Sequence, residues 1–188
     1  MNICFTSDTH FGAERTLKLS RRPFNSVKEM DKIMIDNWNK IVGKDDLIFH
    51  LGDFGGYERV KELNGKIYLI FGNYERKDLK DKFDNDEEEF RNYLSNLGFS
   101  EIWFYNSNCI YKNKNSKFIM SHEPSKLPKI YEKDTDIHLF GHIHEKQLVK
   151  RFGLNVGVDC HAFKPVDLDT VLFYDNAIKN FYDEEVFM

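Results

Sequence analysis

The chain has 188 residues, 41% of them hydrophobic, and a formal charge of −4, which is typical of one globular domain with a substantial core. These values exclude a disordered chain, and the weak negative charge gives no general attraction to nucleic acid or to anionic membranes. A nucleic-acid partner would need a local basic patch, which the sequence does not indicate. Because no internal repeat or Pro/Ser-rich linker is present, we expect one domain over residues 1–188.

Residues 1–4 lead straight into an apolar run, without a basic leader, a long apolar segment or a cleavage site. No stretch approaches the roughly 18 apolar residues that a bilayer span needs, so no membrane partner is expected. Cys4, Cys109 and Cys160 are odd in number and lack Cys-x-x-Cys spacing. We interpret them as reduced thiols of a cytoplasmic protein. The oligomeric state is not indicated.

Two helices are predicted in the first half of the chain. Ser26 and Glu29 form a capping-box pattern, and apolar residues then recur at helical spacing from Val27 to Ile41. A second helix is expected over residues 87–97, ending at Gly98. It overlaps the charged block at 78–91, which we interpret as a solvated helix pair or an insert.

Short apolar runs between these helices predict buried strands at 3–5, 47–49, 67–71, 118–120 and 137–140, with further strands expected at 152–159 and 170–174. The segment "KNKNS" at 112–116 suggests a hairpin turn. Continuous apolar runs that alternate with helices favour an α/β fold with covered sheets.

A polar cluster follows each of the first five runs: "SDTH", "HLGDF", "FGNYE", "SHEP" and "GHIH". Ligands of open α/β sheets bind at the carboxyl ends of the strands, and the glycines of three clusters allow tight turns and close backbone approach. Each cluster alone is weak evidence, because Gly-Asp and Gly-Asn usually mark turns and an isolated histidine is usually structural. The candidate donors are Asp8, His10, Asp53, Asn73, His122, His142 and His144.

Such a cluster would be costly to bury without a cation. Imidazoles with Asp and Asn oxygens and no thiolate suit Mn²⁺ first, with Fe, Zn²⁺ or Ni²⁺ as alternatives. Seven donors exceed the needs of one ion and fit two divalent transition-metal ions that share a carboxylate.

The order Asp-x-His, Gly-Asp, Gly-Asn, His, Gly-His-x-His resembles the calcineurin-like metallophosphoesterases, from residue 1 to the "GVD" near 159. "FTSDTHFG", "RPF" and "HLGDF" are similar to a small group met in bacterial and phage genomes. The resemblance implies a four-layer α/β sandwich of two mixed sheets flanked by helices. One metal would take Asp8, His10 and His144, the other would take Asn73, His122 and His142, and Asp53 would bridge them.

The two histidines of "GHIH" could face the cluster together if the segment is extended, because residues i and i+2 then point the same way. Each ring must be neutral at its ligating nitrogen, so metal loss is expected as the pH falls below about 6. Two metals can hold a bridging hydroxide at neutral pH and clamp a phosphate for in-line displacement. Arg22 and Arg15 are the candidate substrate-binding residues, with Lys164 as a further cation that could bind phosphate oxygens.

The candidate catalytic residues are Asn73 and Tyr74, and Tyr74 stands where the family pattern has a proton-donating His. A phenol of pKa near 10 is poorly matched to proton transfer at pH 7. Three interpretations stay open: a preference for good leaving groups, replacement by His50 or His161, or low activity. His50 and His161 also fit structural roles. Ala13 is a second departure, because close relatives often have His there.

The first functional hypothesis is a metal-dependent phosphoesterase acting on a phosphodiester, a small nucleotide or another small phosphate ester. The alternative is a phosphate-binding or scaffold protein that retains its metals but hydrolyses weakly. A sequence-specific nuclease is a poorer third hypothesis, because no basic module for a duplex is present.

Overall fold

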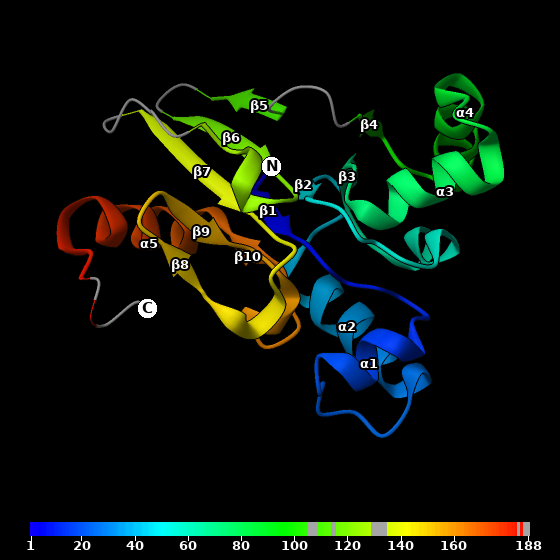
Figure 1. The fold of residues 1–188 in the computed structure, drawn as a ribbon, viewed down its shortest axis with the longest axis horizontal. Helices are drawn as coiled ribbons and strands as arrows, with labels where there is room; N and C mark the ends of the chain where they lie inside the picture. The colour runs from blue at the N-terminus through cyan, green and yellow to red at the C-terminus, as the bar shows by residue number, and fades with distance from the viewer. Residues whose placement is uncertain (105–108, 114–115, 129–134, 184, 186–188) are drawn as a thin grey trace.

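The computed structural model describes residues 1–104, 109–113, 116–128, 135–183 and 185, and these form two five-stranded sheets (Figure 1). The first sheet has the spatial order β10 (Val166–Asp167), β1 (Ile3–Thr6), β2 (Leu47–His50), β3 (Lys66–Ile70) and β4 (Glu101–Trp103). The second has the order β5 (Cys109–Lys112), β6 (Lys117–Ser121), β7 (Asp136–Phe140), β9 (Gly153–Asn155) and β8 (Val149–Lys150).

Both sheets are mixed, with parallel strands in the middle. Strands β1 to β4 run parallel, as do β6, β7 and β9, whereas β10, β5 and β8 pair antiparallel at the edges. Parallel neighbours bring their carboxyl ends to one edge of a sheet. The α/β prediction of two mixed sheets with flanking helices is therefore confirmed.

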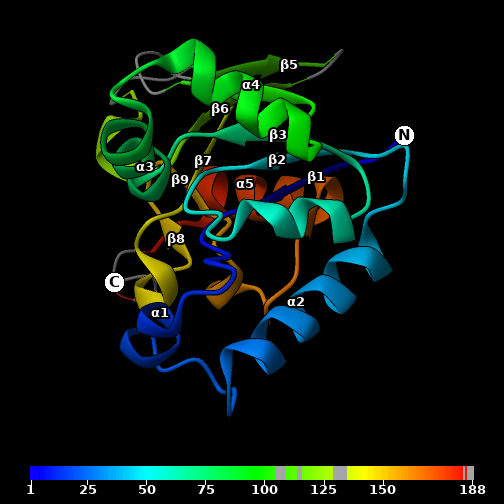
Figure 2. The same ribbon diagram turned by 90° about the vertical axis from the view of Figure 1, so that its right-hand side faces the viewer.

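Five α-helices flank the sheets in the described residues: α1 (Glu14–Leu19), α2 (Val27–Ile41), α3 (Asn73–Phe83), α4 (Glu87–Leu97) and α5 (Leu168–Phe181). In both views α1 and α2 lie below α3 and α4 (Figures 1 and 2). Short 3-10 helices lie at η1 (Tyr57–Glu62), η2 (Pro124–Lys126), η3 (His144–Lys146) and η4 (Val158–Cys160).

Helix α2 begins where the sequence predicts, with one difference in its cap. The backbone N–H of Glu29 donates to Ser26 Oγ at 3.2 Å, but the Glu29 carboxylate accepts from the N–H of Asn25 at 2.7 Å. The reciprocal bond of the capping box is therefore displaced by one residue. Helix α4 has its predicted bounds, with Gly98 at φ 129° after its last residue, and the charged block forms the α3–α4 pair.

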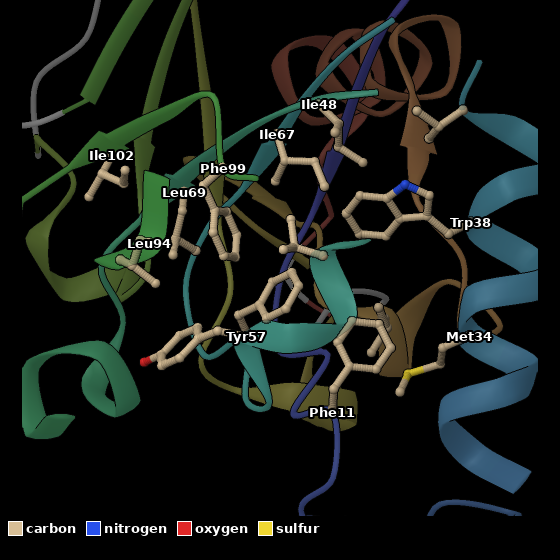
Figure 3. Close-up of a cluster of buried hydrophobic side chains, with 14 of the residues drawn as sticks. Phe11, Met34, Trp38, Ile48, Tyr57, Ile67, Leu69, Leu94, Phe99 and Ile102 are labelled. Carbon is tan, nitrogen blue, oxygen red and sulfur yellow. The ribbon is translucent and has the colours of Figure 1, made fainter. Parts of the chain in front are cut away.

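Alternating side chains of the first sheet fill two separate cores. Phe5 and Phe49 point towards the second sheet, where they meet residues such as Phe118 and Leu139. Ile48 and Leu69 point the other way, into a core covered by helices. In Figure 3 Met34 and Trp38 extend from α2, and Leu94 from α4, towards Ile48, Ile67 and Leu69. Burial of both faces explains why the strands have continuous apolar sequences.

The predicted strand at 170–174 is wrong, because these residues lie inside α5. Asp167 caps this helix by accepting the N–H of Thr170 at 2.7 Å. Val171 and Ile178 are buried seven residues apart, as helical periodicity requires, whereas Phe173 is exposed. The run of β-branched and aromatic residues imitates a strand, and the period of burial identifies a helix. Of the predicted strand at 152–159, only β9 forms, and η4 follows it.

The hairpin prediction is confirmed by the antiparallel pairing of β5 with β6, although residues 114–115 of its turn lie outside the described residues. Within the described residues Cys4, Cys109 and Cys160 are present as thiols, as predicted. Among the described residues, no helix combines the length and apolar character that crossing a membrane requires.

Candidate metal centre

All seven predicted donors meet at one end of the two sheets. Asp8, His10, Asp53 and Asn73 follow strands of the first sheet, and His122, His142 and His144 follow strands of the second. The backbone N–H of His142 donates to Asp8 Oδ2 at 2.8 Å and so links the two sheets across this end. The chain therefore builds the cluster from five separate strand ends.

Two glycines allow the strand-end loops to approach one another. A Cβ atom at Gly72 would collide with the backbone and carboxylate of Asp53, and one at Gly141 would collide with the side chains of Ser7 and Asp8. Larger residues at these positions would push the donor loops apart. The close-approach role predicted for the glycines is thus confirmed at both positions.

Five donors adopt the left-handed backbone conformation: Asp8 (φ 58°), His10 (φ 49°), Asp53 (φ 57°), His142 (φ 72°) and His144 (φ 50°). Each such residue costs on the order of 1–3 kcal/mol and is typical of functional sites. The prediction of an extended "GHIH" segment is wrong. The chain coils as it leaves β7, because Ile143 N–H donates back to Gly141 O at 2.9 Å and His144 begins η3.

Asp53 lies between the two groups of histidines. Its Oδ2 is 3.5 Å from His10 Nε2 and 3.6 Å from His122 Nε2, while Oδ1 accepts the backbone N–H of Tyr74 at 2.8 Å. The carboxylate is 2% exposed, and burial, partly offset by the neighbouring His122, raises its pKa. Its position midway between the groups is the one that a bridging ligand needs.

The hydrogen bond from His122 to the main chain leaves the lone pair of its other ring nitrogen facing further candidate ligands. Its Nδ1 is 2.7 Å from Leu51 O, an acceptor, so a neutral ring carries its proton there. Nε2 then presents a lone pair at 3.0 Å from Asn73 Oδ1 and 3.2 Å from His142 Nδ1. Lone pairs that converge in a buried place repel unless a cation lies among them. The donor set therefore fits a metal ion.

A second group of donors is similarly unsatisfied. Asp8 Oδ1 and both ring nitrogens of His10 are buried without a hydrogen-bond partner. Asp8, His10 and His144 offer ligand atoms that lie within 4.8 Å of one another. Burial, together with the positive charge of Arg22, lowers the pKa of His10 well below its ordinary value, so the ring is neutral and able to bind a metal.

Sequence reasoning missed Glu75, which is fully buried. Its carboxylate accepts the backbone N–H groups of Asp53 and Gly72, both at 2.8 Å, and of Phe54 at 2.9 Å. Burial, with the nearby Asp53, raises its pKa to about 7. It joins the loop after β2 to the loop after β3. One signal in the sequence could have identified Glu75: it is an acidic residue three positions after Gly72, which is the spacing of a helix-capping residue.

Asp159 was also missed, and it orients His144. His144 Nδ1 is 2.8 Å from Asp159 Oδ2, which fixes the proton on Nδ1 and leaves Nε2 free for a metal. Burial alone would lower the pKa of His144, but the bond to Asp159 and the charge of Asp8 raise it overall. An acid soon after a strand was the signal for the other donors, and Asp159 follows β9 in the same way.

The prediction that Arg22 binds substrate phosphate is not supported by its position, because its N–H groups are already used. Nε and Nη2 donate to the two oxygens of Asp159, each at 2.8 Å, and Nη1 donates to Thr9 O at 2.8 Å. The remaining Nη hydrogens reach Asp8 O and Met30 Sδ. Arg22 therefore fixes the positions of the Asp159 side chain and of the loop that carries Asp8.

A cavity of about 270 Å³ opens in front of the donors. Its lining includes Asp53, Asn73, Tyr74 and the predicted phosphate ligand Arg15, which is exposed on α1. The Tyr74 ring meets the His10 ring at an angle of 74°, with 4.6 Å between centroids. The residues that sequence reasoning missed on this wall include Ser20 and Lys146, which carry no motif.

Three other predicted positions lie away from this cavity. Lys164 and His161 line a different cavity, and His161 Nε2 donates to Asn155 O at 2.7 Å. His50 is fully buried, with Nε2 3.0 Å from Thr9 Oγ1. Neither histidine is placed to substitute for the missing imidazole. Ala13 lines a neighbouring cavity together with Tyr74.

We expect Asp159→Asn to weaken metal binding by about 10–100-fold, because His144 loses the carboxylate that fixes its orientation. Ser20→Ala is the matched control, since Ser20 Oγ lies 3.2 Å from the same nitrogen but carries no charge. Its affinity should change by less than about threefold. Metal titration well below the melting temperature measures both. Equal affinities for Asp159→Asn and the native protein would contradict this role.

Burial lowers the pKa of His50 to about 3, so its contribution to stability is present above its unfolded pKa near 6.5 and is lost as the pH falls towards 3. Between pH 7.5 and 5.5 the metal-free protein should lose about 1.4 kcal/mol of unfolding free energy from this group. Urea unfolding in chelator at both pH values tests this. His50→Gln should reduce the difference, and an unchanged difference would exclude His50 as its source.

Comparison with known proteins agrees with this geometry. Residues 1–161 match the family model of the calcineurin-like phosphoesterase superfamily domain. The chain is 32% identical over 185 residues to the uncharacterized protein MJ1445 of Methanocaldococcus jannaschii, covering 90% of this chain and 89% of that protein. The Gene 66 protein of Mycobacterium phage L5 is 31% identical over 83 residues, covering 39% of this chain and 40% of that protein.

A crystal structure, that of the protein of unknown function AQ665 from Aquifex aeolicus, has the same fold. Its TM-score is 0.67 at 23% identity, covering 92% of this chain and 98% of that one. The family match extends over most of the sequence and over every donor described above. The chain therefore belongs to the calcineurin-like phosphoesterase superfamily.

Proposed function

We propose that this protein hydrolyses a phosphodiester or a small nucleotide or phosphate ester with the help of two divalent transition-metal ions. The observation that carries the proposal is the convergence of lone pairs from Asp53 and the six other donors around it, with the His10 ring and Asp8 Oδ1 left without hydrogen-bond partners. Family membership supports a phosphoesterase, and it supports divalent metals as the cofactor class.

One ion would be held by Asp8, His10 and His144. The other ion would be held by Asn73, His122 and His142, and both ions would share Asp53. Nitrogen and oxygen donors without thiolate suit Mn²⁺ first, and Fe, Zn²⁺ or Ni²⁺ are also compatible. The chemistry that such a pair supplies is activation of water near neutral pH and neutralisation of phosphate charge. No covalent attack by a side chain is then required.

The chain's own residues supply orientation around this centre. Arg22 and Asp159 hold His144 in one tautomer, Glu75 fixes the loops of Asp53 and Asn73, and Arg15 offers a cation at the mouth of the cavity. Pre-positioned groups of this kind lower the cost of ordering a bound phosphate. The phenol of Tyr74 can donate a hydrogen bond there, but a phenol is less well matched to proton transfer at neutral pH than the imidazole of the family pattern.

Tyr74 is also the observation behind the second candidate function, which is a phosphate-binding or scaffold protein with weak hydrolysis. A turnover assay with added Mn²⁺, with a donor variant as the control, separates the two functions. Metal-dependent turnover of p-nitrophenyl phosphate, bis-p-nitrophenyl phosphate or 2′,3′-cyclic nucleotides supports the enzyme. Phosphate binding without turnover supports the scaffold.

The proposal predicts about two metal equivalents per chain in protein grown with Mn²⁺, by elemental analysis. Asp53→Asn should lower the occupancy of both sites, because the variant weakens the shared ligand, whereas His122→Ala should chiefly empty one. A stoichiometry near zero with no metal-induced rise in melting temperature would contradict the metal centre. Full occupancy and activity in Asp53→Asn would contradict the bridging role.

Tyr74 predicts a steep dependence of rate on the leaving group. Without a well-matched acid, the rate should fall sharply from p-nitrophenyl esters to alkyl or ribose esters. Tyr74→His should help poor leaving groups selectively, and Tyr74→Phe should lose activity modestly. A loss of about tenfold or more in Tyr74→Phe, about 1.4 kcal/mol of barrier, would mean that the hydroxyl takes part.

The measurement is a linear free-energy series of aryl and alkyl phosphodiesters on all three proteins. The slope of Tyr74→His should be the shallowest of the three, and that of Tyr74→Phe should equal the native slope or be steeper. A shallow slope that is unchanged in both variants would show that position 74 lies outside the chemistry.

A further inference from the structure

A second, larger cavity adjoins the one in front of the metal donors. Its volume is about 500 Å³, and it shares Arg15 and Tyr74 with the first cavity as a common wall. This volume is in the range of small-molecule binding sites. A substrate that fills both cavities would contact both of these side chains.

Small residues keep this second cavity hollow. Gly12, Ala13, Gly55 and Gly56 line one side of it, and a Cβ atom added at Gly12 would meet nothing within 4 Å. The backbones of Phe11 and the two later glycines are tied together, with Gly56 N–H donating to Phe11 O at 2.7 Å. This side is therefore a fixed backbone surface with open space above it.

The charged residues that line this cavity are mostly positive, although the whole chain carries a formal charge of −4. Arg15, Lys77 and Lys82 line the cavity against one carboxylate, that of Asp78. Lys77 pairs with Asp81 at 3.0 Å and Lys82 with Asp78 at 2.9 Å, each within α3 and with the lysine well exposed. Exposed pairs of this kind hold weakly, so both lysines can turn to an incoming anion. Arg15 has no ion pair within the described part of the chain.

We propose that this second cavity binds the part of the substrate beyond the phosphate held at the metal donors, and that this part carries a further anionic group such as a second phosphate. The inference rests on the proposed function and narrows its substrate class. Simple esters with one phosphate would leave the cavity and its three cations unused, whereas a nucleotide with two phosphates would use both cavities.

The probes are the dinucleotide thymidylyl-thymidine with and without an added terminal phosphate, at either end. The native protein with Mn²⁺ should favour one of the phosphorylated forms by about tenfold in kcat/KM, and added salt should reduce the preference. Lys77→Glu should remove most of the preference, because the reversed charge repels the terminal phosphate.

Lys80→Glu is the matched control. Lys80 is exposed on the same helix and the charge change is identical, but its side chain does not line the cavity. The preference should survive in this variant. Equal effects of the two variants, or no preference in the native protein, would show that the lysines are only a solvated helix face and would overturn the proposal.

Failure of the proposed function is recognised separately. If the native protein hydrolyses neither dinucleotide nor bis-p-nitrophenyl phosphate with any metal tested, the enzyme proposal fails. Equilibrium dialysis with the same dinucleotides then decides the binding proposal. Tighter binding of a phosphorylated form that is lost in Lys77→Glu but kept in Lys80→Glu supports the anionic subsite. Equal binding of all probes overturns it.

Discussion

The buried carboxylate of Glu75 holds the loops on which the rest of the site depends. Three backbone N–H groups, from Asp53, Phe54 and Gly72, converge on its two oxygens. These loops leave β2 and β3, so one side chain sets the positions of the bridging candidate Asp53 and of Asn73 at once. Charge-assisted bonds to backbone N–H groups are among the stronger hydrogen bonds in proteins, and removing a buried acceptor leaves several donors unsatisfied. Glu75 is thus a structural element of the centre although it faces no cavity.

The conformation of the donor residues is energetically unfavourable by itself, and the packing of the two hydrophobic cores stabilises it. Five donors have left-handed backbones, and Asp8 and His10 bury polar atoms without partners. The rigid sheets, packed on both faces of β1 to β3, compensate for this cost. A cation would relieve part of it, since metal binding to pre-formed donors adds its free energy to that of folding. Left-handed backbones and donor atoms without hydrogen-bond partners, gathered at one end of a well-packed sandwich, are typical of a metal site.

Residue patterns predicted the sheet architecture from the spacing of apolar residues. They predicted the donors from the position of polar residues directly after the strands. Apolar runs marked the strands, and polar residues directly after them marked the common edge. These patterns failed where contacts between residues that are distant in the sequence determine the local conformation or the role of a side chain. Residues 170–174 have strand composition, but burial of Val171 and Ile178 makes them helical. From the sequence, Arg22 is a cation available to bind phosphate. In the structure its N–H groups donate to Asp159, which lies far along the chain. In the coiled "GHIH" segment the His142 N–H donates to the carboxylate of Asp8, which follows a strand of the other sheet, and no local spacing could reveal this contact.

The sequence separation of these contacts has a consequence for how the protein is made. Arg22 and Asp159 are 137 residues apart, and Asp8 and His142 are 134 apart. A small zinc domain draws its ligands from a short segment, so its metal can nucleate folding. Here the donors extend from Asp8 to His144 and come from both sheets, so the set is complete only when the two sheets have packed together, and such long-range pairing is slow. A metal that binds these donors would therefore bind at the end of assembly, after the two sheets have packed together.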